Sequence, residues 1–253
     1  MALRLANGYW ASKPRTLALL HDVRDSGWCR RTVYIPPAGD GPHTHRDTPH
    51  PPQASWPDDI AFVTEQSGPS ETGLGVFLGE DRAVAVLPPF PLLEYTGRPG
   101  THVAPLVELL ASEIVTGVVL LRLGRYAVGV LRGDELVASK TGTRHVKSRH
   151  RAGGSSQRRF ERSRERLIRE LFDKTCEVAR AVLSPYEAEI DYVLIGGERH
   201  TLGRFVKRCR YMRDLGPRTL GRTLQINRPG QRALDGVASE VWKSRVLVFE
   251  RSD

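Results

Sequence analysis

The stretch Gly117-Val-Val-Leu-Leu-Arg-Leu-Gly-Arg-Tyr-Ala-Val-Gly-Val-Leu-Arg-Gly-Asp-Glu-Leu-Val-Ala-Ser-Lys140 decides the fold of the second half of this 253-residue chain. Three apolar runs within it are typical of β-strands and are separated by short glycine-containing turns. The runs are Gly117–Leu123, Tyr126–Leu131 and Leu136–Lys140. We therefore predict three consecutive strands joined by tight turns.

The residues after these strands predict helices that flank the sheet. A polar loop runs to Gln157, and apolar residues then recur at helical spacing over 158–183, a predicted helix about 39 Å long. Further on, the sequence predicts a buried strand, an amphipathic helix and a final strand. These are Tyr192–Gly196, Thr201–Asp214 and Arg245–Phe249. Three strands followed by helix, strand, helix and strand indicate an α/β fold with a mixed sheet.

The first half of the chain predicts a smaller α+β region. Its expected elements are a helix over 15–26, a strand over 28–35, a hairpin over 73–87 and a helix over 103–114. Residues 36–57 contain seven prolines and three histidines, which is typical of an irregular surface loop. We expect a region over 1–112 that carries this loop, and a second domain over 113–253 with a loop over 141–157.

Positive charge is concentrated in one segment. The chain has a formal net charge of +9, and residues 140–169 hold eleven Lys and Arg against two Glu. Basic and acidic residues balance over the rest of the chain. Such a concentrated field indicates a polyanionic partner, most simply a nucleic acid.

The cysteines and the hydropathy pattern indicate the cellular compartment in which the protein works. Three cysteines without a CxxC pair argue against a disulfide framework or a cysteine zinc site, so we expect Cys176 and Cys209 to be packed thiols. The sequence shows neither a secretory signal nor an apolar stretch long enough to cross a membrane. We expect a soluble, cytoplasmic protein that does not bind membranes.

Two other groups of residues could serve as ligand sites. His43, His45 and His50 could bind a metal, and Gly196-Gly197-Glu198-Arg199-His200 could hold a phosphate at a helix N-terminus. We favour a solvated loop for the histidines and an ordinary strand-to-helix turn for the second segment. We expect no metal and no other cofactor.

The segment between the third strand and the long helix has the chemistry of a loop that approaches a ligand closely. Gly153-Gly154-Ser155-Ser156 has little side-chain bulk, and cationic residues flank it on both sides. Arginine predominates among them, and its planar guanidinium suits bidentate contacts with phosphate. A flexible connector beside a solvated helix face is the alternative. We prefer the binding interpretation because a connector gains nothing from such a charge.

The residues Arg149-His-Arg-Ala-Gly-Gly-Ser-Ser-Gln-Arg-Arg-Phe-Glu-Arg162 resemble a segment of the peptide release factors of eukaryotes and archaea. In that family a Gly-Gly-Gln loop lies between basic flanks and precedes a long helix. The segment is more similar still to the Vms-like release factors, whose motif is Gly-x-x-Gln, and Gly154-Ser155-Ser156-Gln157 fits that motif. The resemblance implies a release-factor catalytic domain, ribonuclease H-like, in the second half.

The same resemblance implies an activity and a set of site residues. The activity is hydrolysis of peptidyl-tRNA on stalled or split large ribosomal subunits, as part of ribosome quality control. It implies that Gln157 orients the water molecule and that Gly153 and Gly154 let the loop reach the tRNA end. The expected RNA-binding residues are Lys147, Arg149, Arg151, Arg158, Arg159, Arg162 and Arg166. Such a reaction rests on positioning and electrostatics, without a protein nucleophile or a metal. We expect the protein to act as a monomer.

Two alternatives remain open from the sequence. One is a non-catalytic factor that binds the ribosome or RNA through the same basic segment. The other is a nuclease that cuts the 3′ end of tRNA, which the lack of an evident acidic metal-binding cluster makes less attractive. Substitution of Gln157 by alanine and sizing of the tRNA product would separate these three functions.

Overall fold

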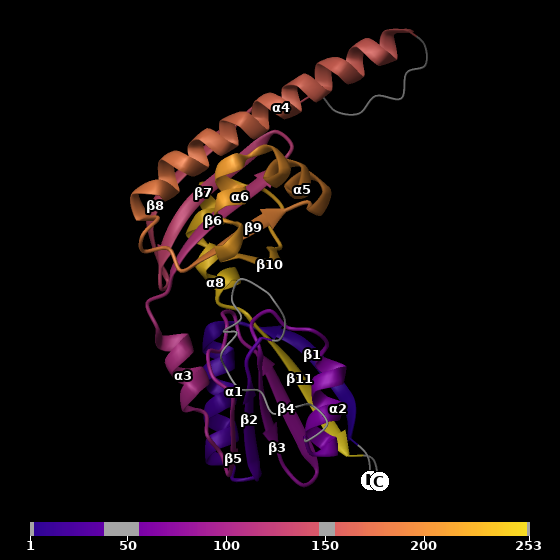
Figure 1. Ribbon diagram of the computed structural model, residues 1–253, viewed down its shortest axis with the longest axis vertical. Helices are drawn as coiled ribbons and strands as arrows, with labels where there is room; N and C mark the ends of the chain where they lie inside the picture. The colour runs from indigo at the N-terminus through magenta and orange to yellow at the C-terminus, as the bar shows by residue number, and fades with distance from the viewer. Residues whose placement is uncertain (1–2, 38–55, 147–154, 252–253) are drawn as a thin grey trace. The chain divides into compact units, whose positions relative to one another are not determined.

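The computed structural model describes residues 3–37, 56–146 and 155–251, and of Ser155 and Ser156 it describes only the backbone. The chain divides into two compact units (Figure 1). The first unit comprises Met1–Ser112 together with Val241–Asp253, and the second comprises Glu113–Glu240.

The first unit is built on a six-stranded sheet with the order β1-β11-β4-β3-β2-β5. All of its strand pairs are antiparallel. The strands are β1 (Leu3–Ala11), β2 (Arg31–Ile35), β3 (Leu74–Leu78), β4 (Arg82–Leu87), β5 (Thr96–Pro99) and β11 (Ser244–Arg251). The predicted hairpin of β3 and β4 is confirmed, as is the strand at β2.

Three helices accompany this sheet: α1 (Lys13–Asp25), α2 (Asp58–Ser67) and α3 (Ala104–Ala111). Helix α2 buries Ile60 and Val63 in a core with β-strand residues such as Val76 and Phe249. The helices predicted over 15–26 and 103–114 are confirmed by α1 and α3, whereas α2 was not predicted. Most of the Pro/His-rich loop expected over 36–57, including His43, His45 and His50, lies outside the described residues.

Strand β11 corrects the expected extent of the second domain. We predicted that the strand over 245–249 would join the sheet of the second half, but β11 lies between β1 and β4 of the first sheet. Its Leu247 and Phe249 are buried in the core of the first unit. The apolar pattern of this segment fits either sheet, so the sequence alone does not identify its partners. Figure 1 shows the yellow β11 among the indigo and purple strands.

The second unit contains a five-stranded sheet with the order β10-β9-β6-β7-β8. The strands are β6 (Val115–Arg122), β7 (Arg125–Arg132), β8 (Glu135–Thr143), β9 (Tyr192–Gly197) and β10 (Thr219–Leu224). The three consecutive strands predicted over 117–140 are β6, β7 and β8, paired antiparallel. Strands β9 and β10 add in parallel, so the sheet is mixed as predicted.

Helices cover both faces of this second sheet. On one face, the long helix α4 (Ser155–Leu183) packs against β7 and β8, and α5 (Arg199–Arg208) packs against β6 and β9. Residues of β7 alternate between the two faces. Val128 and Val130 lie in the core shared with α4, while Gly129 faces Leu234 of α7 (Gln231–Asp235). The remaining helices are α6 (Arg210–Asp214), α8 (Val237–Val241) and the 3₁₀ turns Ser184–Tyr186 and Gly216–Arg218.

The amphipathic helix predicted over 201–214 is wrong in one respect. Cys209 has extended backbone angles, φ −84° and ψ 105°, so it ends α5 and precedes α6. Hydrophobic residues on both sides of Cys209 are buried in one core, which explains why the apolar periodicity continues across the break. Over the described ranges, none of the helices combines the length and the apolarity that crossing a bilayer requires.

Candidate functional site

Gln157 lies in the first turn of α4. Because α4 begins at Ser155, the predicted loop over 141–157 is wrong at its end, and it is also wrong at its start because β8 continues to Thr143. Gln157 is therefore the third residue of a 29-residue helix rather than the last residue of a loop. The first four backbone N–H groups of a helix have no carbonyl partner within it, and that of Gln157 is one of them.

The side chain of Gln157 has a partner on its own helix. Its Nε2 donates a hydrogen bond of 3.1 Å to Oε1 of Glu161, one turn further along α4. This bond leaves the amide oxygen of Gln157 as an acceptor directed elsewhere. No role was predicted for Glu161, although its position four residues after Gln157 would place the two side chains together if the helix included Gln157.

The structure places some of the predicted RNA-binding residues and not others. Arg158, Arg159, Arg162 and Arg166 are exposed on α4. The remaining predicted site residues, Lys147, Arg149, Arg151, Gly153 and Gly154, lie outside the described residues. The described part of the site is therefore one helix end that carries Gln157 among exposed arginines.

The C-terminal part of α4 is fixed in the second unit, and its N-terminal part extends past the sheet (Figure 1). The buried residues of the fixed part begin at Ile168 and continue to Leu183. At the boundary, Nη2 of Arg144, which follows β8, lies 3.2 Å from Oε2 of Glu170. Arg166 approaches the other oxygen of Glu170 at 3.8 Å. Arg166 therefore has an acidic neighbour in Glu170.

Two ion pairs join α4 to α5. Arg204 donates from Nη2 to Oε2 of Glu165 at 2.5 Å, and Arg208 donates from Nε and Nη2 to the two oxygens of Asp173 at 2.6 and 2.8 Å. The hydrogen bond from Arg204 lowers the pKa of Glu165, and that from Arg208 lowers the pKa of Asp173. Both carboxylates are therefore ionised at neutral pH and face the arginines of α5 as charged groups. Nothing in the sequence indicated these partners.

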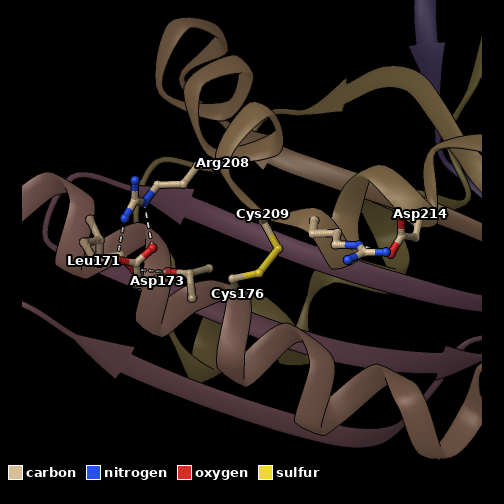
Figure 2. Close-up of a disulfide and its surroundings, with 8 residues drawn as sticks. Leu171, Asp173, Cys176, Arg208, Cys209 and Asp214 are labelled. Atoms are coloured by element: carbon tan, nitrogen blue, oxygen red, sulfur yellow. Dashed lines mark hydrogen bonds and ion pairs between the residues drawn. A yellow bond between two sulfur atoms is a disulfide. The ribbon is translucent and has the colours of Figure 1, made fainter.

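A disulfide between Cys176 and Cys209 adds a covalent link between α4 and the break that separates α5 from α6 (Figure 2). The prediction of two packed thiols is corrected by this bond, whose Cα atoms are 5.5 Å apart. The cysteines are 33 residues apart in the sequence, and only the packing of α4 against α5 and α6 brings them together. Figure 2 shows the ion pair of Asp173 and Arg208 beside the disulfide.

The segment Gly196–His200 is an ordinary strand-to-helix turn, as predicted. The carboxylate of Glu198 caps α5 by accepting hydrogen bonds from the backbone N–H groups of His200 and Thr201, which occupies the donors that a phosphate would use. The hydroxyl of Thr201 also donates to Glu198 and, together with these bonds, lowers its pKa. Within the described ranges, no three His, Cys, Asp or Glu side chains gather as a metal site would require.

The two units differ in charge. The second unit carries 26 Lys and Arg against 15 Asp and Glu, whereas the first carries 12 against 14. The excess of positive charge thus belongs to the unit that presents Gln157. A surface of this kind favours contact with the phosphates of a nucleic acid.

Comparison with known proteins places these features in a family. Residues 115–247 match the sequence profile of the Actinobacteria/chloroflexi VLRF1 release factor. Peptide chain release factor subunit 1 of Archaeoglobus fulgidus is 33% identical over 133 residues, which cover 53% of this chain and 33% of that protein. Its counterpart from Thermococcus sibiricus is 32% identical over 197 residues, covering 72% of this chain and 47% of that protein. The chain thus spans less than half the length of these two relatives.

Solved structures give weaker similarity. An archaeal translation termination factor, aRF1, aligns with a TM-score of 0.38 and 17% identity, over 88% of this chain and 68% of that one. Archaeoglobus fulgidus Pelota aligns with a TM-score of 0.30 and 11% identity, over 94% of this chain and 67% of that one. The family is instead shown by the profile match, which includes the entire sheet of the second unit and the helix with Gln157. On that match, the chain belongs to the Actinobacteria/chloroflexi VLRF1 release factor family.

Proposed function

We propose that this protein is a peptidyl-tRNA hydrolase that frees nascent chains from tRNA on stalled or split large ribosomal subunits. The observation that carries the proposal is the position of Gln157 in the first turn of α4, next to the exposed Arg158 and Arg159. In this proposal the protein works in the cytoplasm as a monomer and contributes to ribosome quality control. Family membership supports a release function at the ribosome.

The proposed chemistry is attack of water on the ester that joins the peptide to the tRNA. The amide oxygen of Gln157 accepts a hydrogen bond from this water and directs its lone pair toward the ester carbonyl. The backbone N–H of Gln157 belongs to the first turn, where the helix itself supplies no carbonyl partner, and in this proposal it stabilises the developing oxyanion. As the water oxygen bonds to the carbonyl carbon, the ester C–O bond breaks and one proton of the water passes to the tRNA oxygen, which leaves as a hydroxyl group. The new carboxyl group of the peptide loses the other proton to solvent. No step requires a nucleophilic side chain.

Arginines of α4 supply the binding energy in this proposal. Arg158, Arg159 and Arg162 lie within two turns of Gln157, so their guanidinium groups contact phosphates close to the reacting ester. Lys147, Arg149, Arg151 and Arg166 extend these contacts, and Gly153 and Gly154 permit a close approach to the tRNA. Binding through such contacts is strongly dependent on salt.

The test compares two glutamines whose side-chain amides make the same kind of hydrogen bond. Gln231 begins α7, and its Nε2 donates to Asp235 one turn later at 2.8 Å, much as Gln157 donates to Glu161. With stalled large subunits that carry labelled peptidyl-tRNA, we expect Gln157→Ala to slow peptide release by about 100-fold or more. Gln231→Ala should release at the wild-type rate, and both variants should co-sediment with the subunits.

Three results would contradict the proposal. Full release by Gln157→Ala would remove Gln157 from the reaction. Binding by wild-type protein without any release would indicate a non-catalytic factor. A shortened tRNA product, in place of intact deacylated tRNA, would indicate a nuclease.

A further inference from the structure

Three links connect α4 to α5 and to the start of α6: Glu165 with Arg204, Asp173 with Arg208, and the disulfide of Cys176 with Cys209. We refer to them together as the interhelical staple. We propose that the interhelical staple positions the N-terminal end of α4, and that thiol–disulfide exchange at Cys176–Cys209 regulates peptide release. This inference rests on the proposed function and names the regulation of its site.

The position of Gln157 depends on small rotations of α4 because the helix is long. Gln157 lies 19 residues before Cys176 in the sequence, which corresponds to about 28 Å along the helix axis. A rotation of about 10° around the disulfide would move Gln157 by roughly 5 Å over that length. A misplacement of about 1 Å can slow a reaction 100-fold. The attachment of α4 therefore has a direct effect on the chemistry at its far end.

The buried core residues of α4 lie on both sides of Cys176, with Ile168, Leu171 and Phe172 on the side toward Gln157. Phe172 packs edge-to-face on Phe205 of α5 with ring centroids 6.0 Å apart. Arg204, which pairs with Glu165, also lies over the ring of Phe172 at 5.8 Å. Along α4, the links of the interhelical staple thus lie on both sides of Phe172. The ion pair of Glu165 and Arg204 is the link nearest to Gln157.

The disulfide is the strongest of the three links. The side chains of Glu165 and Arg204 are 44% and 38% exposed, and those of Asp173 and Arg208 are 56% and 43% exposed. Exposed ion pairs are weak, and they break and re-form readily. The disulfide instead joins α4 covalently to Cys209, a buried residue at the break between α5 and α6. Arg204 and Arg208 act as positioning residues, and the disulfide fixes the arrangement that they favour.

Reduction of this disulfide needs two molecules of a low-molecular-weight thiol. The half-buried Cys176 is the more accessible sulfur, whereas Cys209 is 2% exposed. A thiolate attacks Sγ of Cys176, and the sulfur of Cys209 leaves with the electron pair of the S–S bond and takes up a proton. A second thiolate attacks the small-molecule sulfur of the mixed disulfide. Cys176 is released as a thiol, and the small molecule leaves as its own disulfide.

The experiment measures single-turnover peptide release from stalled large subunits by the full-length protein, oxidised or reduced with a phosphine. The variants are wild type, Cys176→Ser/Cys209→Ser and Cys29→Ser, which removes a buried cysteine of the first unit that forms no disulfide. We expect reduction to lower the wild-type rate constant at saturating subunits about tenfold. The subunit concentration that gives half the maximal rate should stay unchanged, and reoxidation should restore the rate.

The controls separate positioning from loss of folding. Cys176→Ser/Cys209→Ser should have the low rate under both conditions, and Cys29→Ser should follow wild type. Equal rates for oxidised and reduced wild type would overturn the proposal, as would a full rate for the double serine variant. Hydrogen exchange of the free protein should show faster exchange of α4 amides between residues 165 and 176 after reduction.

The two proposals fail in different ways. If no form releases peptide, the proposed function is wrong, and hydrogen exchange alone then tests the interhelical staple. Unchanged exchange in α4 after verified reduction would overturn the staple whether or not the protein hydrolyses peptidyl-tRNA. Faster exchange there, without any release, would support the positioning of α4 and remove its proposed link to hydrolysis.

Discussion

The side-chain amide of Gln157 donates a 3.1 Å hydrogen bond to the carboxylate of Glu161. An exposed pair at this spacing contributes about 0.2–0.5 kcal/mol, equivalent to a factor of about two in an equilibrium constant. The bond orients Gln157 without locking it. We therefore predict that Glu161→Ala changes the rate of peptide release by no more than about threefold, measured as the single-turnover rate constant. A loss as large as that expected for Gln157→Ala would show that Glu161 takes part in the reaction.

The end of β9 should tolerate no side chain at Gly197, the last residue of the strand. Its φ is +137°, and an added Cβ would lie 2.0 Å from the carbonyl oxygen of Leu121. We predict that Gly197→Ala lowers the free energy of unfolding by about 2–4 kcal/mol, measured by urea denaturation. Gly203 provides the control, because it lies in α5 and a Cβ there meets nothing within 4 Å. Gly203→Ala should stabilise the protein by up to about 1 kcal/mol, and equal destabilisation by both substitutions would contradict this account.

The α4–α5 ion pairs should weaken in acid. Hydrogen bonds from the arginines lower the pKa of Glu165 and of Asp173 in the folded state. Their contribution is therefore complete above the ordinary carboxyl pKa of about 4 and is lost as the pH falls through the lowered values. We predict that Glu165→Gln/Asp173→Asn costs up to about 1 kcal/mol per pair at pH 7, since both pairs are exposed.

The same comparison repeated at lower pH checks the sign. The difference in unfolding free energy between wild type and the double variant should shrink steadily below pH 4. Substitution of the exposed Glu135 by glutamine removes a carboxylate outside the contact of α4 with α5 and should leave the unfolding free energy at pH 7 unchanged. A difference in unfolding free energy that grows as the pH falls would exclude this role for the two carboxylates.

The salt dependence of binding to large subunits should show whether the arginines next to Gln157 contact phosphates. Each lost phosphate contact lowers the slope of log affinity against log salt by about one. We predict that Arg158→Ala/Arg159→Ala weakens binding to large subunits and reduces this slope by about two, measured by co-sedimentation across a salt series. Arg30→Ala, which removes an exposed arginine paired with Glu80 in the first unit, should leave the slope unchanged. Equal slopes for all three proteins would place the RNA contacts elsewhere.

The disulfide should also stabilise the second unit against unfolding. It links residues 33 apart, and closure of a loop of this length in the unfolded chain corresponds to about 3–4 kcal/mol. We predict that reduction lowers the unfolding free energy by that order, measured by urea denaturation with and without reductant. Cys29→Ser in place of reduction should not reproduce the change. A reduced protein as stable as the oxidised one would rule out this contribution.

The sequence predicted local elements better than it predicted their partners. The runs over 117–140 became β6, β7 and β8, because sequential strands with short turns pair with each other. The strand over 245–249 also formed, but with β1 and β4, which lie far away in the sequence. A strand's pattern records which face is buried and leaves open which strand lies beside it. Strand β1 was missed because most of its residues are exposed and show no clean alternation.

The sequence also predicted only part of the candidate site. The residue types around Gln157 and their charge were evident in the sequence, whereas the start of α4 before Gln157 was not. Glycine and serine favour loops, so Ser155 and Ser156 were assigned to a loop although the structure places them in the helix. The links to Arg204, Arg208 and Cys209 arise from packing between helices, which local propensity does not encode.

The return of β11 to the first sheet has a consequence for how the chain is made. During synthesis, β1 and β4 leave the ribosome long before β11, the strand that lies between them. The second unit is continuous in the sequence and can fold while the sheet of the first unit still lacks β11. Until residue 251 emerges, β1 and β4 expose unpaired edges that are open to wrong pairing. Of the two units, the one whose synthesis starts first is therefore the one that completes its fold last.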